Sequence, residues 1–168
     1  MTTIACALAL VLSLTPGVQP IGEVETHIDK TANFKSFRTY TWRAGHEAFD
    51  RNAHNTIVST IDAKMAGLGF KRVESGGDLV LAYYTLRSSE VDLKALQKLE
   101  KQGKDTAGAT LPIGRLAIVL SLPDWKTTVW SAATRRQIND DPAKRIQDLT
   151  QAVDAIFATY PGPKGAAK

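Results

Sequence analysis

Hydrophobic and polar positions alternate where the charged part of the chain begins. Val24, Thr26 and Ile28 occupy every second position, between charged or imidazole side chains, which predicts a half-exposed strand. The same reasoning predicts further strands at residues 37–42, 70–73, 79–86, 116–122 and 127–134. We expect the strand at 37–42 to pair with the first strand, and the last two strands to form a hairpin.

Two segments have the spacing of an amphipathic helix. The first carries Ile57, Ile61 and Met65 at every fourth position, with Asp50 or Asn52 as its cap and the glycines at 67 and 69 at its end. The second follows Asp141-Pro142, a typical helix start, and its apolar stripe runs over residues 146–160. Both helices are therefore expected to bury one face.

Residues 89–108 form an insertion in which Ser89 and Asp92 are spaced as a capping box, so we expect a short helix there. The tight connection of the last strands excludes a sheet built only of parallel β-helix-β units. The sequence thus predicts an α+β fold: an antiparallel sheet of about five to six strands with two long helices on one face, plus the short inserted helix. We expect one domain over residues 23–162 and a flexible tail at 163–168.

The first 22 residues contain no charged side chain, and residues 4–14 are apolar except for Ser13. This run is about half the length needed to cross a bilayer, so it is typical of a signal-peptide core. We interpret residues 1–22 as a signal peptide and expect export to the periplasm or cell envelope. Cys6 lies inside the apolar run, and its loss with the signal would leave a chain without thiol chemistry or disulfides.

The 168-residue chain has 43% hydrophobic residues and one cysteine, which excludes a chain that is disordered throughout and a disulfide scaffold. It carries 21 basic and 17 acidic side chains, a net charge of +4. Because acidic residues are interspersed among the basic ones, we expect no nucleic-acid binding. Lys94, Lys98 and Lys101 recur at helical spacing and are candidates for contact with an anionic membrane surface or an acidic partner, or are simply solvated.

Candidate catalytic and metal-binding groups are few. His46, Asp50 and His54 could supply a metal site, but the spacing of a zinc-protease helix is absent and solvated loop residues are the better interpretation. Asp140 and Asp141 could share acid and base roles, although capping of the last helix is favoured. No serine lies in a nucleophile-elbow frame and no phosphate-binding loop is present. We therefore predict no catalytic, cofactor-binding or metal-binding residues and no cofactor.

Aromatic side chains could also line a ligand groove, although packing in the core and at strand edges is favoured. The candidates are Trp42, Trp125, Trp130, Tyr83 and Tyr84.

An ordered set of short motifs resembles the bacterial domain-of-unknown-function family 4136. Its most specific piece is the aromatic strand Thr39-Tyr40-Thr41-Trp42. The other pieces are Phe34, Leu68-Gly69-Phe70, Asp78-Leu79-Val80, Gly114-Arg115-Leu116, Val129-Trp130 and residues 157–161. The resemblance covers residues 24–161 and implies a small exported envelope protein, often lipid-anchored, with an α+β fold and no assigned reaction.

We interpret the chain as an exported envelope domain of unknown biochemical function, more consistent with a non-enzymatic binding or structural module than with an enzyme. Its partner would be an envelope protein or a small ligand. Two alternatives stay open at this point. A periplasmic hydrolase would need His46, Asp50 or His54 to converge beside Asp140 and Asp141, and a polyanion-binding protein would show affinity that falls steeply with salt.

Overall fold

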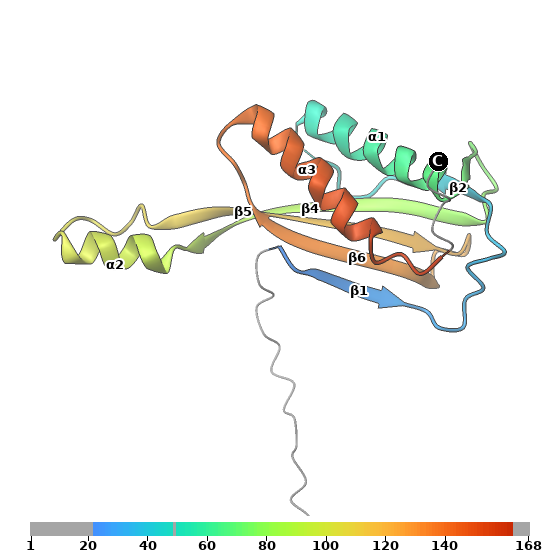
Figure 1. Ribbon diagram of the computed structural model, residues 1–168, viewed down its shortest axis with the longest axis horizontal. Helices are drawn as coiled ribbons and strands as arrows, with labels where there is room; N and C mark the ends of the chain where they lie inside the picture. Colours follow the sequence, from blue (N-terminus) through green and yellow to red (C-terminus); the bar gives the residue numbers. More distant parts are fainter. Residues whose placement is uncertain (1–21, 49, 163–168) are drawn as a thin grey trace, which may run out of the picture.

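The computed structural model describes residues 22–48 and 50–162, so the expected signal peptide (apart from Gly22) and the expected tail lie outside the described residues. Six strands form one sheet in the order β1-β6-β5-β4-β2-β3 (Figure 1). The strands are β1 (Val24–Ile28), β2 (Thr39–Trp42), β3 (Lys71–Arg72), β4 (Leu79–Val91), β5 (Thr110–Ser121) and β6 (Thr128–Gln137). The helices are α1 (Arg51–Gly67), α2 (Leu93–Lys101) and α3 (Pro142–Phe157).

The α+β class is confirmed, but the expected antiparallel sheet is wrong in one half. Strand β2 runs parallel to both β3 and β4, so the sheet is mixed. The reason is the connection: the chain leaves β2, passes through α1 and returns to β3 in the same direction, which is a crossover rather than a hairpin. Strands β4, β5, β6 and β1 pair antiparallel, and the expected hairpin of β5 and β6 is confirmed.

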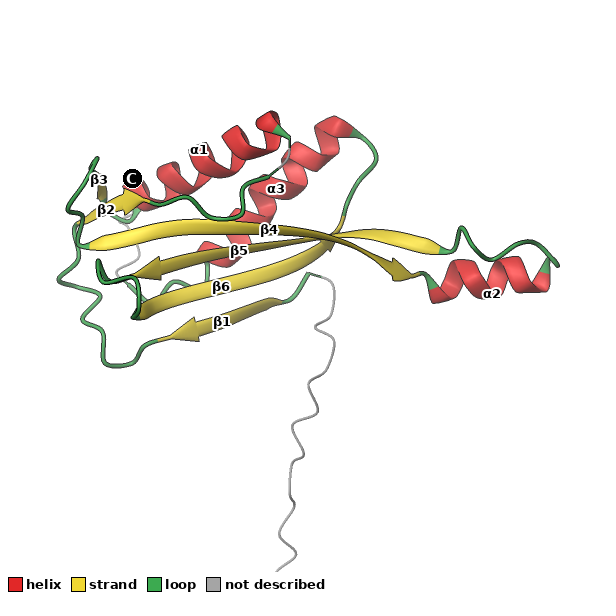
Figure 2. Cartoon of the chain, turned by 180° about the vertical axis from the view of Figure 1, so that it is seen from behind, coloured by secondary structure: helices red, strands yellow, loops and turns green. Residues whose placement is uncertain are grey.

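The expected pairing of the first two strands is also wrong. Strand β1 pairs with β6, with Val24 opposite Thr134 and Ile28 opposite Trp130, and so lies at the far edge of the sheet from β3. The connection over residues 29–38 crosses the end of the sheet to reach β2 (Figure 2). Because that connection is not a tight turn, it does not hold the two strands in register with each other.

Helices α1 and α3 lie on the same face of the sheet, as expected (Figure 1). The stripe of α1 is fully buried at Ile57, Ile61 and Met65, and α3 buries Val153 and Ile156 in the same core. They cover a layer of sheet side chains that includes Leu81, Ile118, Leu120 and Trp130. Each fully buried aliphatic side chain contributes about 1.5–3 kcal/mol relative to exposure, so the contact between these stripes and the sheet is a major source of stability.

The aromatic strand β2 is fixed to its neighbours by its side chains. Tyr40 and Trp42 each donate a hydrogen bond to the Asp62 carboxylate of α1, at 2.6 and 2.7 Å. Thr39 and Thr41 point the other way, and their hydroxyls accept hydrogen bonds from the backbone amides at 78 and 77, both at 3.0 Å. The most specific motif of the sequence is therefore explained by packing and hydrogen bonding within the fold.

Strands β4 and β5 continue well beyond the apolar runs that predict them. Their pairing extends to Val91 opposite Thr110, whereas β6 pairs with β5 only from Ile113 opposite Gln137. Residues 89–112, with α2 at their tip, thus project beyond the rest of the sheet, and we call them the arm (Figures 1 and 2). The expected capping box is wrong because Ser89 lies in β4; Asp92 alone caps α2, accepting from the amides of residues 94 and 95 at 3.0 Å.

Candidate functional site

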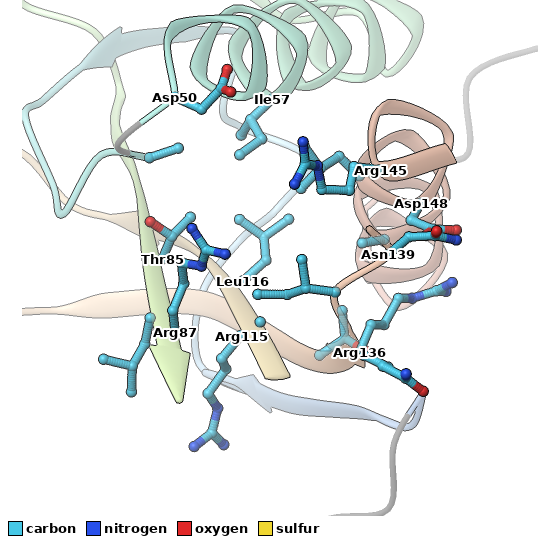
Figure 3. A pocket seen from close by; sticks show the side chains of 18 residues that line it. Asp50, Ile57, Thr85, Arg87, Arg115, Leu116, Arg136, Asn139, Arg145 and Asp148 are labelled. Carbon is cyan, nitrogen blue, oxygen red and sulfur yellow. The ribbon is translucent and has the colours of Figure 1, made fainter. Parts of the chain in front are cut away.

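A cavity of about 180 Å³ lies between α1, α3 and the sheet, at the end from which the arm leaves (Figure 3). Its apolar lining comes from both helices, from β5 and from the segment after β6: Ile57, Leu116, Ile138, Leu149 and Ala152. At Gly114 of β5, an added Cβ atom would lie only 3.3 Å from Cγ1 of Ile138, so the absence of a side chain lets Ile138 pack closely against the strand. The cavity is therefore formed jointly by the two helices, the sheet and the segment that follows β6.

Arginines from three elements stand around this apolar lining: Arg87 of β4, Arg136 of β6 and Arg145 of α3. Arg87 of β4 and Arg136 of β6 are the register partners of Gly114 on the two strands beside β5. Directly paired residues lie on the same face of a sheet, and here that face is the one covered by the helices. Figure 3 shows Arg87 and Arg145 reaching toward the cavity, whereas Arg115 points away from it. Arg115 instead forms an ion pair of 3.1 Å with Glu25.

Within the described residues, none of Arg87, Arg136 and Arg145 lies within 4.0 Å of a carboxylate oxygen in an ion pair. The Nη1 atom of Arg136 donates to Oε1 of Gln151 at 3.5 Å, and its Nε atom is buried without a hydrogen-bond partner. A buried donor without a partner costs free energy, and a ligand acceptor would recover it. The neighbouring Arg135 points to the other face and pairs with Glu90.

Asp50 and Asp148 also line the cavity. The Asp50 carboxylate caps α1, accepting from the amides of Ala53 and Asn52 at 3.0 and 2.7 Å. These two hydrogen bonds, and secondarily the charge of Arg145, hold the pKa of Asp50 below its usual value. Asp50 therefore stays ionised at neutral pH and is a weak base, which favours a binding role for this part of the molecule over proton transfer.

The histidines of the hypothetical metal site are separated by the sheet. His54 of α1 is hydrogen-bonded through Nδ1 to the hydroxyl of Tyr83 at 2.6 Å, on the helix-covered face. His46 contacts the ring of Tyr84, whose side chain points to the opposite face, with ring centroids 6.1 Å apart. No group of three metal-ligating side chains occurs within residues 22–48 and 50–162, so the site of His46, Asp50 and His54 is not assembled.

The adjacent carboxylates of Asp140 and Asp141 lie in different environments. Asp141 caps α3, accepting from the amide of Ala143 at 2.9 Å, and Pro142 opens the first turn as expected. Asp140 is exposed beside it. Neither histidine is hydrogen-bonded to this pair, so the convergence that a hydrolase would require is absent among the described residues.

The aromatic candidates fall into two groups rather than one groove. Tyr83 and Trp130 are buried in the core, and Trp42 is half-buried against Tyr83. Tyr84 is 38% exposed and Trp125 is 57% exposed, with the guanidinium of Arg43 stacked 4.0 Å from the Trp125 ring centroid. None of the five lines the cavity.

The three lysines at helical spacing lie on α2, at the tip of the arm and away from the cavity (Figure 1). The sequence did not single out Arg87, Arg136 or Arg145 as site residues. They lie 9 to 58 positions apart and meet only through strand register and helix packing. The one local sign was the tandem Arg135-Arg136 inside an apolar strand, where alternation must direct one arginine toward the core.

The architecture defines a small α+β domain in which two helices cover one face of an open mixed sheet. The chain belongs to the family described as "Domain of unknown function (DUF4136)", whose model matches residues 24–162, and the resemblance read from the sequence is confirmed. No curated protein matches the chain. Within the described residues, no helix is both long enough and apolar enough to traverse a lipid bilayer.

Solved structures include several with a similar arrangement. A PDZ domain protein from Parabacteroides distasonis ATCC 8503 is 12% identical with a TM-score of 0.55, over 84% of this chain and 36% of that chain. The PelC dodecamer from Paraburkholderia phytofirmans is 13% identical with a TM-score of 0.47, over 86% and 100%. Lipoprotein GNA1162 from Neisseria meningitidis is 11% identical with a TM-score of 0.40, over 70% and 95%. The first likeness shows a shared fold; the chain spans about a third of the Parabacteroides protein.

Proposed function

We propose that this chain is an exported cell-envelope domain that acts as a non-enzymatic binding module, with the cavity between α1, α3 and the sheet as its ligand site. One observation carries the proposal: an apolar lining meets arginines that have no carboxylate partner within ion-pair distance among the described residues. Small-molecule sites are mostly apolar concavities with a few convergent polar groups that fix orientation.

The chemistry of the cavity favours a small anion with a short hydrocarbon part. Guanidinium groups bind carboxylates and phosphates through paired hydrogen bonds, and Arg87 and Arg145 are directed toward the cavity. A cavity of 180 Å³ is comparable with an engineered apolar cavity of about 150 Å³ that binds benzene. A hydrocarbon part of about six carbons therefore fits, with its anionic group at the arginines.

The lining supports binding rather than catalysis. Its hydroxyl groups belong to Thr85 and Thr134, and both donate to backbone carbonyls, at 3.3 and 3.0 Å. No histidine lines the cavity to activate them, and Asp50 is a weak base because its pKa is lowered. An activated nucleophile needs an adjacent base, which this arrangement does not provide.

The export part of the proposal is supported by the uncharged, apolar start of the sequence. If residues 1–22 act as a signal peptide, the mature protein will begin near Glu23, at the start of the family match. Amino-terminal sequencing of the protein recovered from the periplasmic fraction measures this directly. A chain that retains Met1 and stays in the cytoplasm would contradict export without affecting the cavity.

Binding is tested with hexanoate as the probe, followed by methyl NMR spectra of the chain. We expect a dissociation constant of roughly 0.1–1 mM, the range open to a ligand of this size. The shift changes should be confined to Ile57, Leu116, Ile138 and Leu149, which line the cavity. Two comparison compounds separate the contributions: 1-hexanol keeps the hydrocarbon part without the charge, and acetate keeps the charge without most of the hydrocarbon part.

We expect hexanol to bind at least about tenfold more weakly than hexanoate, because it cannot form charge-assisted hydrogen bonds. Acetate should produce no saturable shifts. Replacing Ala152 by Leu should fill part of the cavity and abolish hexanoate binding, since Ala152 is buried in its wall. Equal binding of hexanol and hexanoate, or shifts centred on the helix-free face of the sheet, would overturn the proposed site.

A further inference from the structure

The arm carries an unusual share of exposed apolar surface. Val91 is 60% exposed and Leu93 is 67% exposed, and both flank Asp92 at the point where β4 passes into α2. Leu86, at the base of the arm, is 63% exposed. Val91 and Leu93 belong to the arm, which projects from the sheet away from α1 and α3 (Figure 2). Packing within this chain does not account for them.

The outward face of α2 is cationic. Lys94, Lys98 and Lys101 lie four and three residues apart, so their side chains share one face, while Leu96 and Leu99 are half-buried on the other side of the helix. None of the three lysines forms an ion pair within the described residues. The polar neighbours that line the same surface are neutral: Gln97 and Gln102.

The acidic residues nearest this face are not directed against the lysines. Asp92 is engaged in capping α2, and Asp105 accepts from the amide of Ala107 at 2.9 Å. By helical geometry, Glu100 lies close to Leu93 around the helix axis, on the side of α2 and not on the face that carries the three lysines. The tip of the arm therefore presents a row of unpaired cations beside exposed aliphatic side chains.

We propose that the arm docks on an anionic lipid surface through α2, with Lys94, Lys98 and Lys101 against the headgroups and Leu93 in the interfacial layer. Charge complementarity selects this occupant, because a cationic helix face next to aliphatic groups is the pattern of interfacial helices. The inference does not depend on ligand binding in the cavity.

The test is co-sedimentation of the full chain with vesicles of phosphatidylglycerol and phosphatidylethanolamine, compared with pure phosphatidylcholine vesicles. The variant K94Q/K98Q/K101Q should lower the partition coefficient on the anionic vesicles by roughly 100-fold, from the contribution of each basic residue near such a surface. The matched control K30Q/K35Q/K71Q removes the same charge from exposed lysines on the body of the protein and should change binding less than about threefold. All chains share the same amino-terminal segment, so its contribution cancels.

A second variant reports on the aliphatic contact. Leu93→Trp places a fluorophore on the arm, and subtracting the emission of the parent chain isolates its signal. On anionic vesicles this added emission should shift to shorter wavelength, and brominated acyl chains should quench it. Added salt should release the chain, since the attraction is electrostatic. Absence of anionic-vesicle binding by the parent chain, equal losses in the two triple variants, or an unshifted added emission in the Leu93→Trp variant would overturn the proposal. Binding of an acidic protein in place of vesicles would do the same.

Discussion

At the scale of single residues, Asp62 shows how one carboxylate holds an edge of this sheet. It accepts hydrogen bonds from the Tyr40 hydroxyl, the Trp42 indole and, at 2.8 Å, the Arg72 guanidinium. Tyr40 is 2% exposed, and burial together with its hydrogen bond to Asp62 raises the pKa of the Tyr40 hydroxyl well above its usual value. Strands β2 and β3 are thus tied to α1 by one side chain.

Replacing Asp62 by Ala should lower the free energy of unfolding by about 2–4 kcal/mol, because two inward-facing donors lose their acceptor. Denaturation in urea, monitored by tryptophan fluorescence, measures the loss. Glu74→Ala is the matched control: Glu74 is exposed in the turn between β3 and β4, and its loss should cost less than about 0.5 kcal/mol. Equal effects of the two substitutions would show that the network contributes nothing.

At the scale of elements, the three helices have the same kind of N-terminal cap. Each begins after an aspartate whose carboxylate accepts from two backbone amides of the first turn: Asp50, Asp92 and Asp141. This arrangement satisfies amides that otherwise lack a partner and places a negative charge at the positive end of the helix dipole. Of the two adjacent acidic residues before α3, Asp141 therefore has a structural role as the helix cap.

The pair Asp140 and Asp141 allows an internally controlled experiment. Asp141→Ala should lower the free energy of unfolding by about 1 kcal/mol, the usual cost of losing a helix cap. Asp140→Ala, one residue earlier and exposed, should change it by less than about 0.5 kcal/mol. Thermal denaturation of both variants gives the comparison, and a larger effect at Asp140 would contradict the capping role of Asp141.

The elements that the sequence predicted well are those whose signal is local. Periodicity places α1 and α3 because one helix face must be apolar, and the caps at Asp50 and Asp141 lie within the same short segments. The ends of β4 and β5 were not predictable in the same way. Beyond Leu86 the side chains become polar, yet the strands continue because each supplies the other's backbone hydrogen bonds.

At the scale of the whole molecule, strand order was the main unpredicted feature. The parallel arrangement of β2 follows from the crossover through α1, and β1 reaches β6 across more than 100 positions of sequence. The cavity has the same origin. Arg87, Arg136 and Arg145 come from three elements and have no shared motif, so only the register of β4, β5 and β6 and the placement of α3 bring them together.

The molecule separates its two proposed contacts in space. The cavity lies within the body, between α1, α3 and the sheet, and the cationic face of α2 lies at the tip of the arm (Figure 1). Changes to one should therefore leave the other intact, since distant sites without shared partners contribute independently. The variants of Lys94, Lys98 and Lys101 should accordingly bind hexanoate like the parent chain.

The central claim is that the cavity recognises an anion through the arginines directed toward it, Arg87 and Arg145. Calorimetric titration of hexanoate into Arg145→Gln and Arg115→Gln tests it most directly, because Arg145 reaches toward the cavity and Arg115 points away from it. We expect the dissociation constant to rise about tenfold or more in Arg145→Gln, because one charge-assisted hydrogen bond is lost. In Arg115→Gln it should change less than twofold. Equal affinities for the two variants would contradict it.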